Sequence, residues 1–180
     1  MKAVGGDYQK ETEIEFDVMK NILYKLMPLL ASIGSQMHII GEAKECEEAY
    51  GFYVATMESL LGQNTRPLSE LYFWLGIYYF KNLYHLEKAR ICFQKAFLIL
   101  DEYKETDRDE HLLRTAETQR DLLRMAEIHI NVASVLKAQL KYVDSISEFE
   151  RAIAIYEQVS GRGSLAYLTC AFEIAQVKFI

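Results

Sequence analysis

The residues of this chain that could bind a metal or transfer protons are few and widely spaced. No H-E-x-x-H motif occurs, and no histidine has another histidine or a cysteine four residues away. Asp107, Asp109 and Glu110 form an acidic cluster, but nothing in the pattern positions them as an acid–base pair. Histidines in this setting are usually structural or solvated, so we expect no metal site. The four are His38, His85, His111 and His129.

The motifs of phosphate binding and nucleophilic catalysis are also absent. The sequence has no Walker loop, no G-x-S-x-G and no glycine-rich phosphate cradle. Its lysines and arginines are scattered rather than gathered in a stripe, and the formal net charge is -6. The sequence therefore predicts a protein with no catalytic residues, no cofactor and no nucleic-acid partner.

Composition favours a helical protein of the cytoplasm. Half of the 180 residues are apolar, whereas prolines number only 2 and glycines 9, too few turn formers for a β-rich fold. The three cysteines, Cys46, Cys92 and Cys170, form no C-x-x-C pair, and we expect buried free thiols in a reducing compartment. No signal-peptide segment is recognisable, and the most apolar run, 71–80, is about half as long as a membrane span.

One sequence pattern recurs along the chain. Its clearest copy is Tyr72-x2-Leu75-Gly76-x2-Tyr79 followed by Ala89-x3-Phe93-x2-Ala96. The small residue of the first half recurs at Gly34, Gly76, Ala133 and Ala175, at intervals of 42, 57 and 42 residues. Regular spacing of this kind indicates stacked antiparallel helix pairs. We call the two helices of each pair helix A and helix B.

The pattern places the helices and turns. An N-terminal helix is expected over 1–27, and Pro28 either starts the next helix or kinks a longer one. Further helices are expected over about 42–61, 68–82 and 86–103, then in a long helix A ending near 138, a helix B after it, and a last helix from about 164. Turns are expected at 39–45, 82–86 and 139–143. The interval of 57 indicates lengthened helices with a protruding hairpin at 106–109, or a plain charged loop there.

These motifs resemble tetratricopeptide repeats of the kinesin light chain type. Gly62 and Gly161 each precede the small residue of the next helix A by 14 residues, and Asn131-Val132-Ala133 is similar to the Asn-Leu-Ala of that subtype. The departures are Tyr72 in place of Trp, Ser145 in place of Ala, and the longer middle interval. The resemblance implies an all-α fold, a right-handed α-solenoid of antiparallel helix pairs, with about three and a half repeats over 28–180.

The resemblance also implies a concave groove, lined by helix A residues, that binds a peptide or a partner protein. An asparagine such as Asn131 both donates to and accepts from an extended backbone. The alternative is that these residues pack the helices together and that Asn131 ties down a neighbouring helix. The implied groove residues are Phe73, Trp74, Ile77, Lys81, Ile130, Asn131, Ser134, Lys137, Phe172, Glu173 and Gln176.

Function is therefore expected to be non-catalytic protein binding in the cytoplasm. The alternatives are a structural scaffold of a cytoskeletal or ciliary assembly, and a helical accessory domain of a larger enzyme. The fourth repeat has only its helix A, whose apolar residues include Phe172, Ile174 and Phe179. A solenoid does not end stably on such a face, so we expect a longer chain, self-association through this helix, or another chain covering it.

Overall fold

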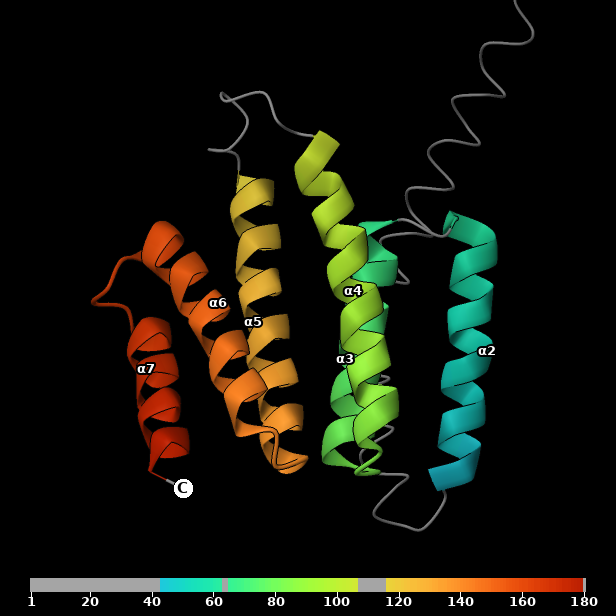
Figure 1. The fold of residues 1–180 in the computed structure, drawn as a ribbon. Coiled ribbons are helices and arrows are strands. Elements are labelled where there is room, and N and C mark those ends of the chain that lie inside the picture. Colours follow the sequence, from blue (N-terminus) through green and yellow to red (C-terminus); the bar gives the residue numbers. More distant parts are fainter. Residues whose placement is uncertain (1–42, 63–64, 107–115, 180) are drawn as a thin grey trace, which may run out of the picture.

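The computed structural model describes residues 43–62, 65–106 and 116–179, and all regular secondary structure in these ranges is α-helical (Figure 1). The all-α class expected from the sequence is thus confirmed for the described part of the chain. The helices are α2 (Ala43–Leu61), α3 (Arg66–Lys81), α4 (Leu86–Thr106), α5 (Ala116–Ala138), α6 (Tyr142–Ser160) and α7 (Leu165–Lys178). The expected helix over 1–27, Pro28, Gly34 and the segment 107–110 lie outside the described residues.

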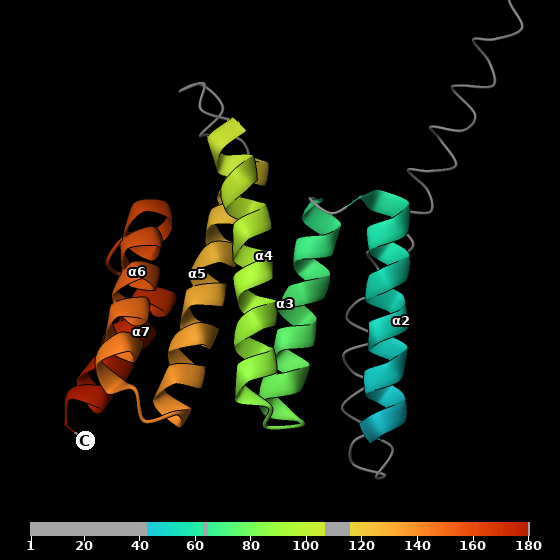
Figure 2. The same cartoon turned by 45° about the vertical axis from the view of Figure 1, so that its right-hand side comes forward.

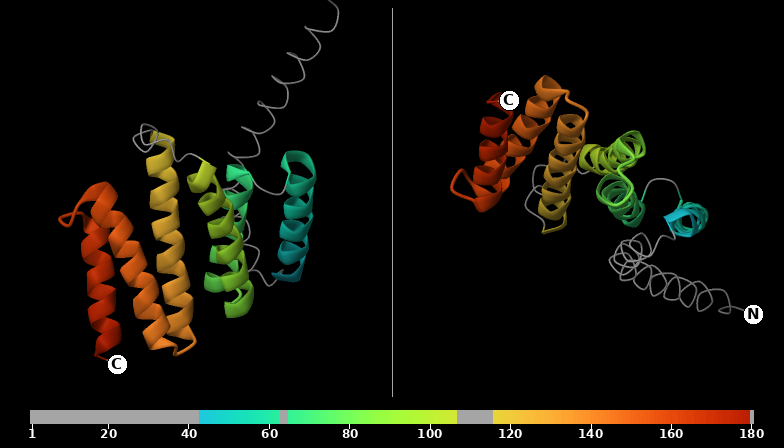
Figure 3. Two further views of the ribbon diagram at one scale, coloured as in Figure 1. Left: turned by 45° about the horizontal axis from the view of Figure 1, so that its top comes forward. Right: turned by 90° about the horizontal axis from the view of Figure 1, so that it is seen from below.

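Consecutive helices lie side by side in a row, with α2 and α7 at its two ends (Figures 1 and 3). Packing is most extensive within two pairs, α3 with α4 and α5 with α6. Helix α4 also contacts α5, and α6 contacts α7, so each pair rests on the next (Figure 2). The pair α3–α4 and the pair α5–α6 are called hairpin 1 and hairpin 2 below.

Both hairpin turns lie where the sequence places them. Four residues, 82–85, separate α3 from α4, whereas three, 139–141, separate α5 from α6. Each turn contains one residue in the left-handed region, Tyr84 with φ 54° and Leu140 with φ 62°. This conformation reverses the chain but costs a side chain about 1–2 kcal/mol. The turns are therefore held by the packing of the helices on either side.

Small residues at helix ends explain where two of the longer helices stop. Gly62 follows α2 with φ +81°, and Gly161 follows α6 with φ +79°. Glycine adopts this backbone conformation without steric cost, which makes it the common residue just past a helix C-terminus. At the other end, the Ser164 side chain accepts a hydrogen bond from the Tyr167 N–H at 3.3 Å and caps α7.

The repeat motif forms the contacts within each hairpin. A β-carbon added at Gly76 would lie 2.6 Å from the Phe93 ring, so only glycine allows α3 to approach α4 so closely. The other positions of the repeat pattern are also buried, at 1% exposure or less: Ala89, Phe93, Ala96, Ala133, Phe149 and Ala152. The prediction that Gly76 lies at a close helix contact is confirmed.

Helix lengths bear on the longer middle interval. Helix α5 has 23 residues whereas α3 has 16, so the third helix A is indeed the longer one within the described chain. Helix α4 continues to Thr106, three residues beyond the expected end at 103. In Figure 1, α4 and α5 both extend toward the same end of the molecule.

Candidate functional site

Helices α3, α5 and α7 carry the predicted groove residues, and we call their common surface the helix A face. On α3, Trp74 and Ile77 are half-buried and Lys81 is exposed. Phe73 is only 5% exposed and belongs to the hydrophobic core. Helix α3 therefore offers an apolar strip ending in a cation, with Phe73 beneath the strip.

On α5, Asn131 and Ser134 of the predicted groove are half-buried and bond within their own helix. The Asn131 side-chain amide donates to the Glu127 carbonyl at 2.8 Å, and the Ser134 hydroxyl donates to the Ile130 carbonyl at 2.8 Å. Asn131 therefore does not tie α5 to a neighbouring helix through this bond. Its side-chain oxygen and second amide hydrogen have no partner among the described residues.

On α7, the predicted residues separate into two environments. Phe172 and Gln176 are exposed. Glu173 is half-buried and forms an ion pair with Lys137 of α5 at 3.0 Å. The structure thus brings two predicted residues, 36 positions apart, into direct contact. This pair offsets the charge of Lys137, so Lys137 offers little free positive charge to a ligand.

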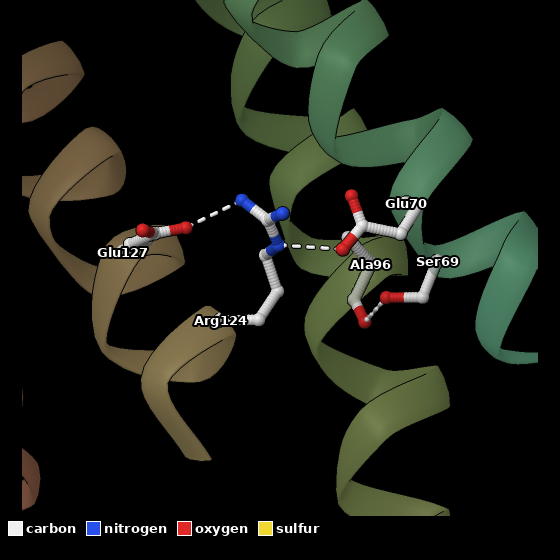
Figure 4. A network of polar contacts seen from close by, with 5 residues as sticks. All are labelled: Ser69, Glu70, Ala96, Arg124 and Glu127. Carbon is white, nitrogen blue, oxygen red and sulfur yellow. Dashed lines mark hydrogen bonds and ion pairs between the residues drawn. The ribbon is translucent and has the colours of Figure 1, made fainter. Parts of the chain in front are cut away.

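A polar network joins α3 to α5 across the helix A face (Figure 4). The Arg124 Nε donates to the Glu70 carboxylate at 2.7 Å, and its Nη1 also bonds Glu127. The guanidinium carbon lies 4.3 Å from the Phe73 ring centroid, close enough for a cation–π contact. Arg124 therefore covers Phe73, which explains why that ring is in the core rather than in an open groove.

The network is largely shielded from water. The Glu70 side chain is 13% exposed and that of Arg124 is 22% exposed. Burial raises the pKa of Glu70, and the positive charge of Arg124 opposes that rise. A second ion pair, Arg66 to Asp121 at 2.8 Å, joins the same two helices. Together these contacts fix α5 relative to α3 and so set the geometry of the helix A face.

Among the described residues, two grooves have linings that include none of the predicted groove residues. The larger, of about 420 Å³, lies between α4, α5 and α6, and we call it the His129 groove. The smaller, of about 350 Å³, lies between α2, α3 and α4, and we call it the Tyr72 groove. The family resemblance implies no binding residue in either groove, because the groove residues that it implies are other positions of helix A.

The two grooves occupy equivalent places in the two hairpins. Helix A residues of the Tyr72 groove recur 57 positions later in the His129 groove, and helix B residues recur 56 positions later. The one-position difference comes from the longer turn of hairpin 1. The equivalent pairs are Tyr72 and His129, Leu75 and Val132, Tyr79 and Leu136, Lys88 and Asp144, Ile91 and Ser147, Cys92 and Glu148, and Lys95 and Arg151.

The chemistry of the two grooves differs despite the shared position. In the His129 groove, the His129 Nδ1 lies 2.6 Å from the Glu148 carboxylate, and Arg151 donates to the other oxygen of Glu148 at 2.6 Å. In the Tyr72 groove, the Tyr72 hydroxyl donates to Glu58, and the Lys95 ammonium lies 4.7 Å from the Tyr72 ring centroid. Most of the charged side chains that line the two grooves thus already have partners.

Metal and thiol chemistry have no support in the described residues. No group of three or more His, Cys, Asp or Glu side chains is placed to hold a metal ion in these ranges. Cys92 and Cys170 are buried free thiols, as expected, while the Cys46 side chain lies outside the described set. Burial raises the pKa of Cys92 to about 12 and that of Cys170 to about 11, so both remain protonated and unreactive at neutral pH.

Comparison with known proteins leaves the family undetermined. No protein-family model matches the sequence, and no curated protein is similar to it. Among the described helices, none combines the length and apolar character that crossing a bilayer demands. The case for a function therefore rests on the geometry of this chain.

Proposed function

We propose that this protein is a non-catalytic protein-interaction module of the cytoplasm. In this proposal the helix pairs are tetratricopeptide-like repeats of a right-handed α-solenoid, and the helix A face binds a peptide segment or a partner protein. The observation that carries the proposal is the repetition of one packing register in hairpins 1 and 2. Gly76 and Ala133 occupy the same place, 57 residues apart, and both are buried against the following helix.

The helix A face has the chemistry that an extended ligand needs. Trp74 and Ile77 supply half-buried apolar surface, and an aromatic ring at the centre of an interface is a common hot spot. Asn131 supplies an acceptor oxygen and a donor hydrogen that the described residues leave unused. These groups match the N–H and C=O of a peptide backbone, which favours recognition with little dependence on side-chain sequence.

The network around Arg124 supports the proposal through rigidity. It fixes α3 and α5 with two ion pairs, at 2.7 and 2.8 Å, before any ligand arrives. A surface held in its binding geometry loses less conformational entropy on association. Trp74 on α3 and Asn131 on α5 are thus presented at a constant spacing.

The test is the substitution Asn131→Ala, measured with peptides selected on the immobilised full chain from a displayed library. We expect the dissociation constant to rise a few-fold to about tenfold, since losing one hydrogen bond costs roughly 0.5–1.5 kcal/mol. The melting temperature should change little, because the only bond that the side chain makes among described residues is to its own helix.

The matched control is Gln94→Ala, which removes an exposed side-chain amide of α4 that lines the His129 groove. It should leave peptide binding unchanged. If Asn131→Ala lowers the melting temperature by several degrees while the selected peptides bind normally, Asn131 belongs to the scaffold and the proposed groove is wrong. If Gln94→Ala alone weakens binding, the ligand uses the His129 groove.

A structural scaffold subunit, for example of a cytoskeletal or ciliary assembly, is the second candidate. It is favoured by the apolar side chains that α7 leaves exposed, because a scaffold contacts partners through several faces. An accessory domain of a larger enzyme is the third. A scaffold would co-purify with large assemblies and yield no discrete short peptide ligand.

A further inference from the structure

The turns of hairpins 1 and 2 lie at the same end of the molecule, and each exposes a large apolar side chain (Figures 1 and 2). Tyr84 in the turn of hairpin 1 is 65% exposed, and Leu140 in the turn of hairpin 2 is 71% exposed. Val143, in the first turn of α6, is 80% exposed. The Gln139 side chain donates to the Glu87 carboxylate at 2.8 Å and so joins the two turns. We call the surface formed by Tyr84, Leu140 and Val143 the turn surface.

The packing of the hairpins does not account for these large side chains. Tyr84 and Leu140 both have left-handed backbone conformations, which glycine adopts freely and asparagine adopts more readily than other residues. Their neighbours Leu83 and Tyr142 pack against the hydrophobic core, whereas Tyr84 and Leu140 point into solvent. Stability alone would therefore favour a small residue at both positions. An exposed apolar side chain in each turn is better explained by contact with something outside the chain.

The two turns are also positively charged in an acidic protein. Segments 81–90 and 137–144 contain five basic and two acidic residues, a formal net charge of +3, whereas the whole chain has -6. Lys81 and Lys141, which flank the turns, are exposed and form no ion pair with a described residue. The other three basic residues are ion-paired: Lys88, Arg90 and Lys137. The turn surface thus combines apolar side chains with two free cations.

We propose that the turn surface docks on an anionic lipid bilayer. Tyrosine and aliphatic side chains enter the boundary between headgroups and acyl chains, while lysines beside them reach anionic headgroups. Neither groove described above is lined by Tyr84, Leu140 or Val143, so these side chains protrude and do not frame a pocket for a partner's side chain. A bilayer needs no such pocket, because it deforms around an inserted side chain. Protrusion together with positive charge therefore favours a lipid surface over an acidic protein.

Docking in this way is compatible with ligand binding elsewhere on the molecule. The helices run along one direction, with both turns at one end (Figure 1). The helix A face extends along α3, α5 and α7, so a bilayer at the turns would reach only its end near Lys81. The inference does not rest on peptide binding to that face. Asn131→Ala should leave vesicle binding unchanged, which keeps failure of the two proposals distinguishable.

Flotation of the full chain with lipid vesicles tests the proposal. The protein should float with vesicles of phosphatidylcholine containing about 30% phosphatidylserine and bind pure phosphatidylcholine at least tenfold more weakly. Raising the salt from about 50 to about 500 mM should weaken the binding, because salt screens the attraction between lysines and anionic headgroups. Failure to float with the anionic vesicles at low salt would overturn the proposal.

The apolar contribution is tested by the double variant Tyr84→Asn and Leu140→Asn. Vesicle binding should fall at least tenfold, because two apolar side chains no longer enter the bilayer. The melting temperature should not fall, because asparagine suits the left-handed backbone. The matched control Leu98→Gln removes a 57% exposed side chain of α4 and should bind normally. An equal loss in the control, or a double variant that melts several degrees lower, would overturn the argument.

The charge contribution is tested by the double variant Lys81→Gln and Lys141→Gln. Each lysine near an anionic surface strengthens attachment about fivefold, so binding should fall about 25-fold. The control is Arg120→Gln, which removes an exposed cation near the start of α5, at the end of that helix away from the turn. It should bind normally, and an equal loss would overturn the assignment. Soluble polyglutamate separates the two possible occupants. If it binds as tightly as the vesicles do, with the same dependence on Tyr84 and Leu140, an acidic protein replaces the bilayer and the proposal is wrong.

Discussion

Hairpins 1 and 2 share one packing register but satisfy it with different residues. Each has one buried serine that donates to a backbone carbonyl of the facing helix. In hairpin 1, Ser69 of α3 donates to the Ala96 carbonyl at 2.9 Å, whereas in hairpin 2, Ser145 of α6 donates to the Ala133 carbonyl at 2.8 Å. The hydroxyl comes from helix A in one hairpin and from helix B in the other. The register therefore depends on small size at these positions and not on a particular hydrogen bond.

The outer surfaces differ more than the packed interiors. Equivalent exposed positions carry Lys88 and Asp144, or Ile91 and Ser147, in grooves that occupy the same place in the two hairpins. Buried positions tolerate only residues of the right volume, whereas groove positions are limited mainly by solubility. Function is therefore to be sought in the side chains that differ between hairpins.

The largest expected effect comes from enlarging the residue at the closest contact of hairpin 1. Gly76→Leu forces a side chain into a place where even a β-carbon would lie 2.6 Å from the Phe93 ring. Overpacking of this severity should lower the free energy of unfolding by about 3 kcal/mol. In a protein of this size that corresponds to a fall in melting temperature of roughly 6–12 °C, measurable by circular dichroism.

The control for this change is Gly51→Leu in α2, where an added β-carbon meets nothing within 4 Å. That substitution should be neutral or stabilising, because leucine favours a helix over glycine by somewhat under 1 kcal/mol. Equal melting temperatures for Gly76→Leu and the unchanged protein would show that hairpin 1 does not hold the register described here.

The second prediction concerns the ion pair that joins hairpin 1 to hairpin 2. Arg124→Met removes the guanidinium that lies over Phe73 and leaves the Glu70 carboxylate without its cationic partner. Because Glu70 is only partly buried, we expect a loss of about 2 kcal/mol at pH 7, below the 3–5 kcal/mol typical of fully buried pairs. Urea denaturation at several pH values gives the measurement.

The pH dependence of this loss has a definite sign. Burial already raises the pKa of Glu70, and removing Arg124 removes the main opposing influence. The folded variant therefore holds this proton more tightly than the unfolded chain, so its deficit should shrink as the pH falls toward the ordinary carboxyl range. Arg162→Met, which removes an exposed ion pair with Glu157, should change the stability little at any pH. A deficit for Arg124→Met that grows on acidification would contradict the assignment.

Local spacing explains which parts of this structure the sequence could predict. The small residues at Gly76 and Ala133 and the glycines at 62 and 161 are short-range signals, and they placed the turns and helix ends to within a few residues. The contact between Arg124 and Glu70 joins residues 54 apart and leaves no periodic trace. Phe73 was predicted to face the groove. Its burial depends on a side chain of α5, and the family pattern carries no information on which side chain of α5 covers it.

The buried serines provide the smallest effect and the finest test of the comparison between hairpins. Ser145→Ala and Ser69→Ala each remove one buried hydrogen bond without changing the packing, so each should cost about 1 kcal/mol. The two losses should be similar, because each serine has a fully buried alanine, Ala126 or Ala89, at the equivalent position of the other hairpin. Their effects in the double variant should add to within about 0.5 kcal/mol, since no described partner is shared.

The control is Thr169→Ala, whose exposed hydroxyl bonds only its own helix at 2.8 Å and whose loss should be nearly neutral. Denaturation midpoints in urea measure all four variants. A Ser69→Ala loss well above that of Ser145→Ala would mean that hairpin 1 relies on its hydrogen bond as hairpin 2 does not, and the two could no longer be regarded as copies of one packing solution.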